Sequence, residues 1–432
     1  MLETLQRDSV RYFWELANPE NGLVPDSSRV GAPSSIAATG FGLASLVVAA
    51  DRDWISRGAV AERILATLRT FWNGPSGEGS AAIGERGFFY HFLDMKTGHR
   101  ARRCEVSTID TTFLLAGGLI AAAYFDGSDP VEAEIRELGH ALYRRTDWLW
   151  ALAGGNTVSH GWRPETGFLK ARWQGYNEAL LLQVLALGSP THPIPESSYR
   201  AWTETYRWRK VYEWEVLYSG PLFTHQFSHA WIDFRGISDS YLRERGSDYF
   251  ENSRRATLIQ QRYAMRNPLG FAGYGEHMWG LSSGGGPGPS VRFAAGRPRR
   301  FWDYRARGVP WGPDDGTLMP GAVAASLPFA PELVLRTLEA IEERVPGARG
   351  DFGYRCGFNP TFAPEGWAYA HSFGIHQGPV VLMVENFQTG LIWNLTRRCA
   401  PVEEGLRRAG FRGGVSDRAR PCVGLRGQRV GN

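Results

Sequence analysis

The sequence is poor in several features that mark familiar classes of protein. Four of its 432 residues are cysteine and none forms a Cys-x-x-Cys pair, so neither a zinc site nor a disulfide-dense scaffold is indicated. Its longest apolar runs, residues 36–50 and 113–125, are too short to span a bilayer and contain glycines. We therefore expect no membrane insertion and no metal.

Signatures of nucleotide and nucleic-acid chemistry are missing as well. No dinucleotide-binding glycine motif follows a strand, no phosphate loop ends in Gly-Lys-Ser/Thr, and no Gly-x-Ser-x-Gly elbow joins a strand to a helix. The net charge of +4 arises in residues 401–432, which hold seven arginines against three acidic residues, so the first 400 residues are neutral. A neutral body argues against a nucleic-acid partner. We also expect no cofactor.

The start of the chain allows two locations. It shows no basic segment followed by an apolar stretch, so no secretory signal is visible and the sequence as given points to the cytoplasm. A start assigned too far downstream would hide a signal, and the protein would then be periplasmic or secreted. The sequence predicts no oligomeric state.

Helical periodicity is what the chain does have. Apolar residues recur at helical spacing through most of the first 400 residues. About twelve helices are predicted, over residues 2–16, 36–50, 59–72, 106–125, 130–149, 177–187, 199–206, 229–245, 249–266, 319–325, 331–344 and 379–397. An even number of helices joined by long aromatic loops predicts an all-α fold, an (α/α)6 toroid over residues 1–400. The Gly/Arg-rich tail over residues 401–432 is expected to be disordered.

Tryptophan is abundant, with 16 residues, many beside charged or polar groups in loop-like segments. Aromatic faces combined with carboxylates, amides and arginines suit the apolar faces and hydroxyl rims of sugars. The pattern therefore predicts a carbohydrate cleft formed by the loops, although packing of the core is the simpler explanation for any single tryptophan.

Four carboxylates stand out because their neighbours are small or apolar: Glu105, Asp110, Glu178 and Glu385. Asp110 lies at the start of a predicted helix, where capping is the alternative to a functional role. Glu178 lies in the first turn of another helix, where stabilisation of the helix dipole is the alternative. Glu385 lies in an apolar run, and a buried pair with an arginine is the alternative there.

Two histidines, His225 and His229, are four residues apart and would share one face of a helix. A metal site is conceivable, but no glutamate follows the first histidine as it does in the zinc-protease motif. We therefore expect these side chains to hydrogen-bond a substrate or their neighbours.

Several longer strings occur in one order along residues 2–398. They include 175–179 (Gly-Tyr-Asn-Glu-Ala), 223–235, 248–257, 273–281, 315–317 (Asp-Gly-Thr) and 377–386. Together they resemble the glycoamylase-like domain family, which includes glycoside hydrolase family 144. The resemblance implies an (α/α)6 barrel with a carbohydrate cleft. It also implies a glycoside hydrolase that acts with inversion on β-glucan, most of all β-1,2-glucan or its oligosaccharides.

The resemblance and the residue types suggest which side chains act. We predict Glu178 as the general acid, because burial at the start of an apolar helix can raise the pKa of a glutamate. Asp110 is the second candidate catalytic carboxylate. Substrate contacts are predicted for Glu105, Tyr176, His225, Asp233, Arg235, Glu276, Trp279, Gln377 and Glu385.

One departure from the family pattern concerns the base. Relatives usually read Gly-Ile-Asp where this chain reads Gly374-Ile375-His376. If His376 activates water in place of that aspartate, activity should fall below about pH 6.5 as the imidazole becomes charged. In the rival interpretation His376 only binds a sugar hydroxyl and Asp110 or another carboxylate is the base.

Other functions remain compatible with the same residues. The chain would be a carbohydrate-binding protein, or a component of a glucan-processing system, if the histidine at position 376 abolishes catalysis. An epimerase on the same type of barrel is a weaker third interpretation. Turnover of glucans separates these functions from hydrolysis.

Overall fold

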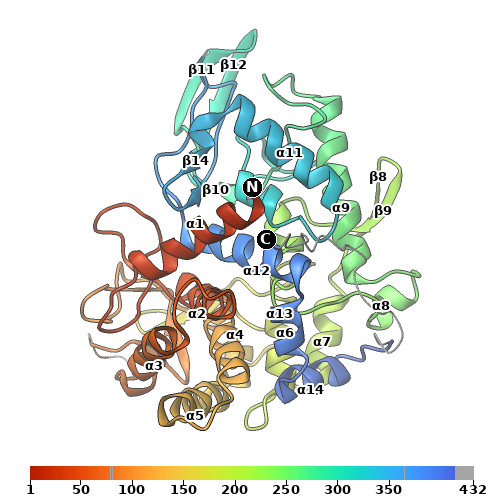
Figure 1. Ribbon diagram of the computed structural model, residues 1–432. Helices are drawn as coiled ribbons and strands as arrows, with labels where there is room; N and C mark the ends of the chain where they lie inside the picture. The colour runs from red at the N-terminus through yellow and green to blue at the C-terminus, as the bar shows by residue number, and fades with distance from the viewer. Residues whose placement is uncertain (78, 80, 364, 414–432) are drawn as a thin grey trace, which may run out of the picture.

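The computed structural model describes residues 1–413 apart from residues 78, 80 and 364, and this part of the chain is rich in helix (Figure 1). Its α-helices are α1 (Leu2–Glu15), α2 (Ile36–Asp51), α3 (Arg57–Asn73), α4 (Thr108–Tyr124), α5 (Pro130–Arg145), α6 (Leu180–Gly188), α7 (Glu196–Thr203), α8 (Ser240–Arg243), α9 (Tyr249–Arg266), α10 (Pro320–Ala324), α11 (Pro331–Arg344), α12 (Gly374–Gln388), α13 (Leu391–Thr396) and α14 (Ala400–Arg408).

Short strands join the helices. They are β1 (Ser34–Ser35), β2 (Gly84–Glu85), β3 (Phe88–Tyr90), β4 (Phe92–Leu93), β5 (Val106–Ser107), β6 (Gly161–Arg163), β7 (Gly167–Phe168), β8 (Trp208–Val211), β9 (Trp214–Leu217), β10 (Ser283–Gly284), β11 (Ser290–Ala294), β12 (Arg297–Phe301), β13 (Arg305–Ala306), β14 (Arg349–Gly350) and β15 (Gly353–Tyr354). Five of them form an antiparallel sheet in the order β2-β3-β5-β6-β7, in which Tyr90 pairs with Val106, and the others form two-stranded pairs.

An inner ring is formed by α2, α4, α6, α10 and α12, which are buried on nearly every side. Residues 222–234 take the sixth place. Around the ring, α2 packs between α4 and α12, α6 packs on α4, and α10 packs on α12. The ring closes through residues 222–234, because Leu181 of α6 donates its N–H to Ser228 Oγ at 3.0 Å and Gln226 donates to the Ala322 carbonyl of α10 at 2.6 Å.

An outer layer alternates with this ring along the chain. Helices α1, α3, α5, α7, α9 and α11 each precede one inner element, and each buries only part of its surface. Six outer and six inner elements in alternation make the (α/α)6 toroid, which confirms the predicted fold class. No helix of the described residues is long and apolar enough to cross a membrane.

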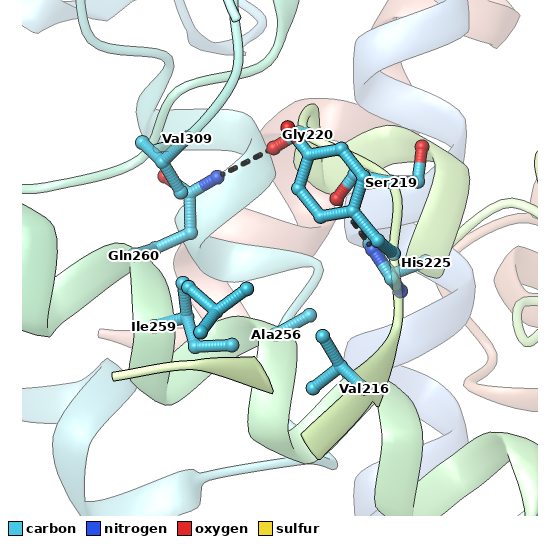
Figure 2. Close-up of a pocket in the computed structure, with 10 residues that line it drawn as sticks. Val216, Ser219, Gly220, His225, Ala256, Ile259, Gln260 and Val309 are labelled. Carbon is cyan, nitrogen blue, oxygen red and sulfur yellow. Dashed lines mark hydrogen bonds between the residues drawn. The ribbon is translucent and has the colours of Figure 1, made fainter. Parts of the chain in front are cut away.

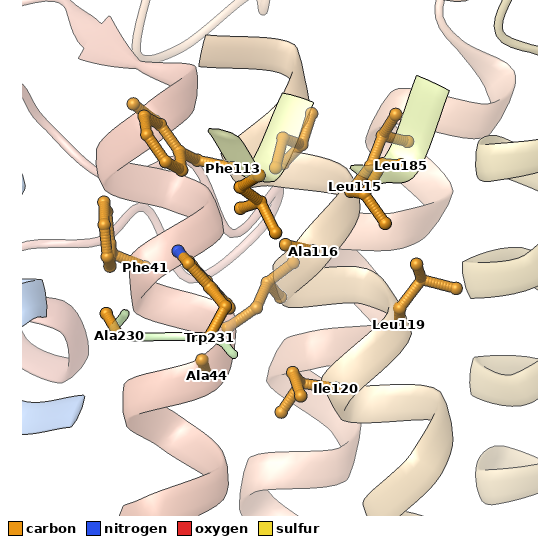
Figure 3. Close-up of a cluster of buried hydrophobic side chains, with 14 of the residues drawn as sticks. Phe41, Ala44, Phe113, Leu115, Ala116, Leu119, Ile120, Leu185, Ala230 and Trp231 are labelled. Atoms are coloured by element: carbon orange, nitrogen blue, oxygen red, sulfur yellow. The ribbon is translucent and has the colours of Figure 1, made fainter. Parts of the chain in front are cut away.

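Aromatic side chains fill the inside of the ring (Figure 3). The ring centroid of Phe41, on α2, lies 5.2 Å from that of Phe113 on α4 and 5.1 Å from that of Trp231. Tilted aromatic pairs of this kind contribute about 1 kcal/mol beyond the burial of their surface. The centre of the toroid is therefore a packed core.

All inner helices begin at one end of the ring. Ser35 and Ser107 cap α2 and α4, each accepting an N–H from the third residue beyond it. Gly374 in the first turn of α12 faces Ala38 in the first turn of α2. The loops and short strands that lead into the inner helices therefore meet at this end.

Two predicted helices differ from the structure. Residues 229–239 form turns, with only α8 helical beyond them. Their apolar side chains are enclosed by the ring, so helical spacing of apolar residues does not require a helix there. The helix predicted over 379–397 instead starts at Gly374, contains Pro379, and is divided by Gly390, whose φ of 73° ends the helical path before α13.

The C-terminal boundary also differs from the prediction. Helix α14 packs on α6, and the N–H of Arg412 donates to the Ser238 carbonyl at 3.0 Å. Residues 401–413 therefore belong to the folded body, contrary to the expected disordered tail. Residues 414–432 of that predicted tail lie outside the described part of the chain.

A glycine contact between inner helices should be essential to stability. A Cβ on Gly117 of α4 would lie 2.2 Å from the Gly40 carbonyl oxygen on α2, whereas a Cβ on Gly58 of α3 would meet nothing within 4 Å. We expect Gly117→Ala to lower the free energy of unfolding by about 1–3 kcal/mol or more, because the helices are forced apart. Gly58→Ala, the matched control, should raise it by roughly 0.5–1 kcal/mol through helix propensity. Denaturant unfolding measures both, and an unaffected Gly117→Ala variant would contradict the packing.

Candidate active site

Polar side chains from six segments lie where the inner helices begin. Asp26 precedes α2, His91 lies between β3 and β4, Asp110 and His376 lie in the first turns of α4 and α12, Glu178 precedes α6, and Tyr304 lies between β12 and β13. We call the hollow that they line the cleft.

The cleft is recognised from groups that are both enclosed and accessible. Asp26, His91, Glu178 and His376 keep accessible surface, and Tyr304 is 55% exposed. Burial among protein atoms is nevertheless the largest influence on the pKa of each of these groups. A side chain that is surrounded by protein and still reached by solvent lies in a hollow.

His91 lies between two carboxylates. Its Nδ1 is 3.0 Å from Glu105 Oε1 and its Nε2 is 3.7 Å from Asp110 Oδ2. Burial alone would lower the pKa of His91, but Asp110 and Glu105 outweigh it and raise the pKa to about 9. The hydrogen bond with His91 lowers the pKa of Glu105 to about 2. At neutral pH this group is an imidazolium between two carboxylates.

Glu178 is the protonated carboxyl group of the cleft. Burial raises the pKa of Glu178 to about 7, and the charge of Asp110 raises it further. Its backbone carbonyl accepts the Ser228 hydroxyl at 2.9 Å, which ties it to the inner ring. A carboxyl group that holds its proton near neutral pH has the property that a general acid needs.

His376 is turned toward a small hollow beneath the loops. Its ring hydrogen-bonds the backbone of Ser283, and burial lowers the pKa of His376 to about 4. The hollow, of about 290 Å³, is also lined by Met319, Cys356 and Phe223. Because burial disfavours the imidazolium, a His376 base would lose activity near pH 4 instead of pH 6.5, and the catalytic role of His376 stays a prediction.

Three predicted substrate contacts are buried structural groups instead. Glu385 has no exposed side-chain surface and accepts Arg52 Nε at 2.9 Å, so the alternative of a buried pair is right. Gln377 donates to the Tyr354 carbonyl at 2.6 Å and is fully buried. Trp279 is fully buried and donates its indole N–H to a threonine hydroxyl of α11. None of the three reaches the cleft.

Asp233 and Arg235 also lie away from the cleft. The Asp233 carboxylate accepts Arg235 at 2.7 Å and Arg397 at 2.9 Å. Arg397 follows α13, and the Arg235 guanidinium lies 4.6 Å from the Trp393 ring of α13, at the end of the ring where the inner helices stop. The structure therefore places both side chains outside the cleft.

Of the remaining predicted substrate contacts, two are buried, one is exposed at the surface, and one belongs to the group around His91. Tyr176 and His225 are 4% and 2% exposed, with ring centroids 5.2 Å apart, so both rings are buried against each other. Glu276 is exposed on the 275–278 turn, beside His277. Only Glu105 of the predicted substrate contacts belongs to the group around His91.

A second hollow lies beside His225 (Figure 2). Its walls come from β8, β9 and α9, with Val309 opposite, and His225 hydrogen-bonds the Ser219 carbonyl at 3.0 Å within it. It is lined mainly by apolar side chains and holds none of the carboxylates, so we place the chemistry in the cleft.

Sequence reasoning missed Asp26, His91 and Tyr304. Neither His91 nor Asp26 stands at a sequence spacing that marks a site. Tyr304 lies in the long loop between the predicted helices 249–266 and 319–325, in which β10 pairs with β13 and β11 with β12. Loop length was the one signal that pointed there.

Comparison with known proteins identifies the family and its fold. The family model Glycoamylase, described as "Putative glucoamylase", matches residues 170–400, more than half of the chain. This chain belongs to the Glycoamylase family. A crystal structure of the same description from Bacteroides uniformis is 31% identical, covers 95% of this chain and 97% of its own, and superposes with a TM-score of 0.84.

Two other Glycoamylase relatives have more specific names. The endo-β-1,2-glucanase from Chitinophaga pinensis, solved with sophorotriose and glucose, is 25% identical over 95% of this chain and 98% of its own, with a TM-score of 0.84. The exo β-1,2-glucooligosaccharide sophorohydrolase (non-reducing end) of Parabacteroides distasonis is 27% identical over 94% of this chain. The chain spans 57% of the length of that relative.

The charged state of His91 can be measured directly. We expect its ring resonances to titrate near pH 9 in an NMR pH series, since Asp110 and Glu105 favour the imidazolium. Glu105→Gln should lower the His91 midpoint by at least about one unit, because one of the two charges in contact is removed. His225, whose pKa burial lowers to about 4, is the internal control and should not move. A His91 midpoint near 6.5 in the wild type would contradict the arrangement.

Proposed function

We propose that the chain is a glycoside hydrolase that cleaves β-1,2-linked glucan or its oligosaccharides. The names of two relatives support this substrate class. The observation that carries the proposal is Glu178, an accessible carboxyl group whose pKa burial raises to about 7, with the charge of Asp110 raising it further. That arrangement suits proton donation to the oxygen of a glycosidic bond.

Hydrolysis with inversion requires a general acid on one side of the glycosidic bond and a general base on the other. Glu178 donates its proton to the leaving oxygen, while a carboxylate on the other side takes a proton from the attacking water. The two carboxyl groups of an inverting enzyme lie roughly 6.5–9.5 Å apart so that the water fits between. Burial raises the pKa of Glu178, and the charge of Asp110 adds to this shift. Asp110 is itself held by the Ser107 hydroxyl and His91.

Aromatic rings beside the carboxylates offer a surface for sugar. Tyr304 is 55% exposed, its ring centroid lies 6.1 Å from that of Phe373, and Tyr369 lies 5.7 Å from the same Phe373 ring. The C–H faces of a glucosyl unit pack on such rings while its hydroxyls reach polar groups. Tyr304, Tyr369 and Phe373 thus provide the aromatic surface that the sequence analysis expects from tryptophan.

Product analysis from a panel of glucans tests the substrate class. Linear β-1,2-glucan, laminarin, cello-oligosaccharides and starch are each incubated with the purified chain, and new reducing ends are measured. We expect them from the β-1,2-linked substrates. No reducing ends from any of the four would overturn the proposal, and calorimetric binding without turnover would favour a carbohydrate-binding protein instead.

The pH profile tests the role of Glu178. The acid must carry its proton, so kcat/KM should fall as pH rises through about 7, the pKa to which burial raises Glu178. Glu178→Gln should lower kcat by about 10²–10⁴-fold while oligosaccharide binding persists in calorimetry. Glu62→Gln, the same change on the exposed face of α3, should leave both unchanged. A Glu178→Gln variant of full activity would exclude this residue as the acid.

A further inference from the structure

Asp26 is held rigidly at the wall of the cleft. It lies in the connection between α1 and α2, where its N–H donates to the Pro33 carbonyl at 2.8 Å and its carbonyl accepts the N–H of Gly374 at 3.0 Å. Ser27 pairs with Phe373 next to it. The backbone of Asp26 is thereby fixed against the first turn of α12, two residues before His376.

The carboxylates of Asp110 and Glu105 have hydrogen-bond or ion-pair partners, whereas that of Asp26 has none among the described residues. Asp110 is bonded to the Ser107 hydroxyl and lies 3.7 Å from His91, with a side chain only 8% exposed. Glu105 contacts His91 at 3.0 Å and an arginine at 3.3 Å. Within the described residues no hydrogen bond or ion pair reaches the Asp26 oxygens, and the side chain keeps accessible surface. Asp26 is therefore the cleft carboxylate that is free to accept a proton.

The charges that shift the pKa of Asp26 differ from those that shift the pKa of Glu178. Burial raises the pKa of Asp26, Asp110 raises it further, and His91 and Arg102 lower it. Asp110 also raises the pKa of Glu178, yet Asp26 and Glu178 are not among the charges that shift each other's pKa. The charge of Asp110 thus acts on both groups.

The other candidates for the base are less suited. His376 faces Ser283 and a small apolar hollow, and the Asp110 carboxylate is occupied by a hydroxyl and an imidazolium. We propose that Asp26 is the general base of the reaction, an assignment that rests on the hydrolase function proposed above.

The step balances with Asp26 and Glu178 alone. The water oxygen forms a bond to the anomeric carbon as one of its protons passes to the Asp26 carboxylate. The bond from that carbon to the glycosidic oxygen breaks, and the oxygen takes the Glu178 proton. Asp26 then releases its proton to solvent and Glu178 regains one, which restores both groups. Burial raises the pKa of Asp26, and the charges of His91 and Arg102 act in the opposite direction, toward the ionised form that a base needs.

Substitution of Asp26 provides the first test. We expect Asp26→Asn to lower kcat on β-1,2-oligosaccharides by about 10²–10⁴-fold with little change in binding by calorimetry. Asp51→Asn is the matched control, because Asp51 is an exposed aspartate at the opposite end of α2, and it should keep wild-type kcat. Thermal unfolding of all variants confirms that they are folded. An Asp26→Asn variant within about threefold of wild-type kcat would overturn the assignment.

Chemical rescue separates a base from a structural residue. Azide attacks the anomeric carbon without needing a base, so it should restore turnover to Asp26→Ala and yield glucosyl azide of the α configuration. Asp110→Ala, which removes the neighbour of both groups, should not be rescued. Rescue of Asp110→Ala together with none in Asp26→Ala would overturn the assignment in favour of Asp110.

Turnover by the wild type distinguishes failure of the Asp26 assignment from failure of the proposed hydrolase function. An active wild type with an active Asp26→Asn variant refutes the base while leaving the hydrolase intact. A wild type that turns over no glucan refutes the hydrolase, and the assignment of Asp26 falls with it. If Asp26→Ala does not fold, Asp26→Asn, which keeps the shape of the side chain, is used with azide for the same comparison.

Discussion

The close approach of the inner helices determines what the rest of the structure can be. A Cβ on Gly40 or Gly117 would lie within 2.3 Å of backbone atoms of the facing helix, and a Cβ on Gly378 would lie 2.3 Å from Phe41. Small residues allow α2, α4 and α12 to lie almost backbone to backbone. Their first turns are therefore crowded together, and the side chains that enter each helix share one hollow.

That crowding gives chemically similar groups different properties. Carboxylates brought into one hollow raise one another's pKa, whereas a cation lowers the pKa of the carboxylates nearest to it most. Glu105, in contact with His91, has a pKa lowered to about 2, whereas that of Glu178, which has no such partner, rises to about 7. The pKa values of these two carboxyl groups thus differ because one of them contacts His91 and the other does not.

The sequence predicted the parts of this structure that have one dominant cause. The sequence predicts helix 331–344 with its observed bounds because the amphipathic pattern of an outer helix is clear. It singles out Glu178 as a candidate because a carboxyl group at the start of an apolar helix is unusual. Glu385 was misassigned because a buried ion pair and a catalytic carboxylate give the same pattern of apolar neighbours. Asp26 and His91 lie in polar loops, and their meeting depends on contacts between distant segments that no local pattern records.

Helix α1 packs on α12, which lies far along the chain from it. Gln6 of α1 donates to the Val381 carbonyl of α12 at 3.1 Å, across 375 residues of sequence. On a ribosome that adds 5–20 residues per second, α1 would wait roughly 20–75 seconds for this partner. During that interval its apolar face has no partner on α12, and the wall that carries Asp26 lacks the helix that fixes it. The complete cleft can therefore form only once α12 has been synthesised and has packed on α1 and α2.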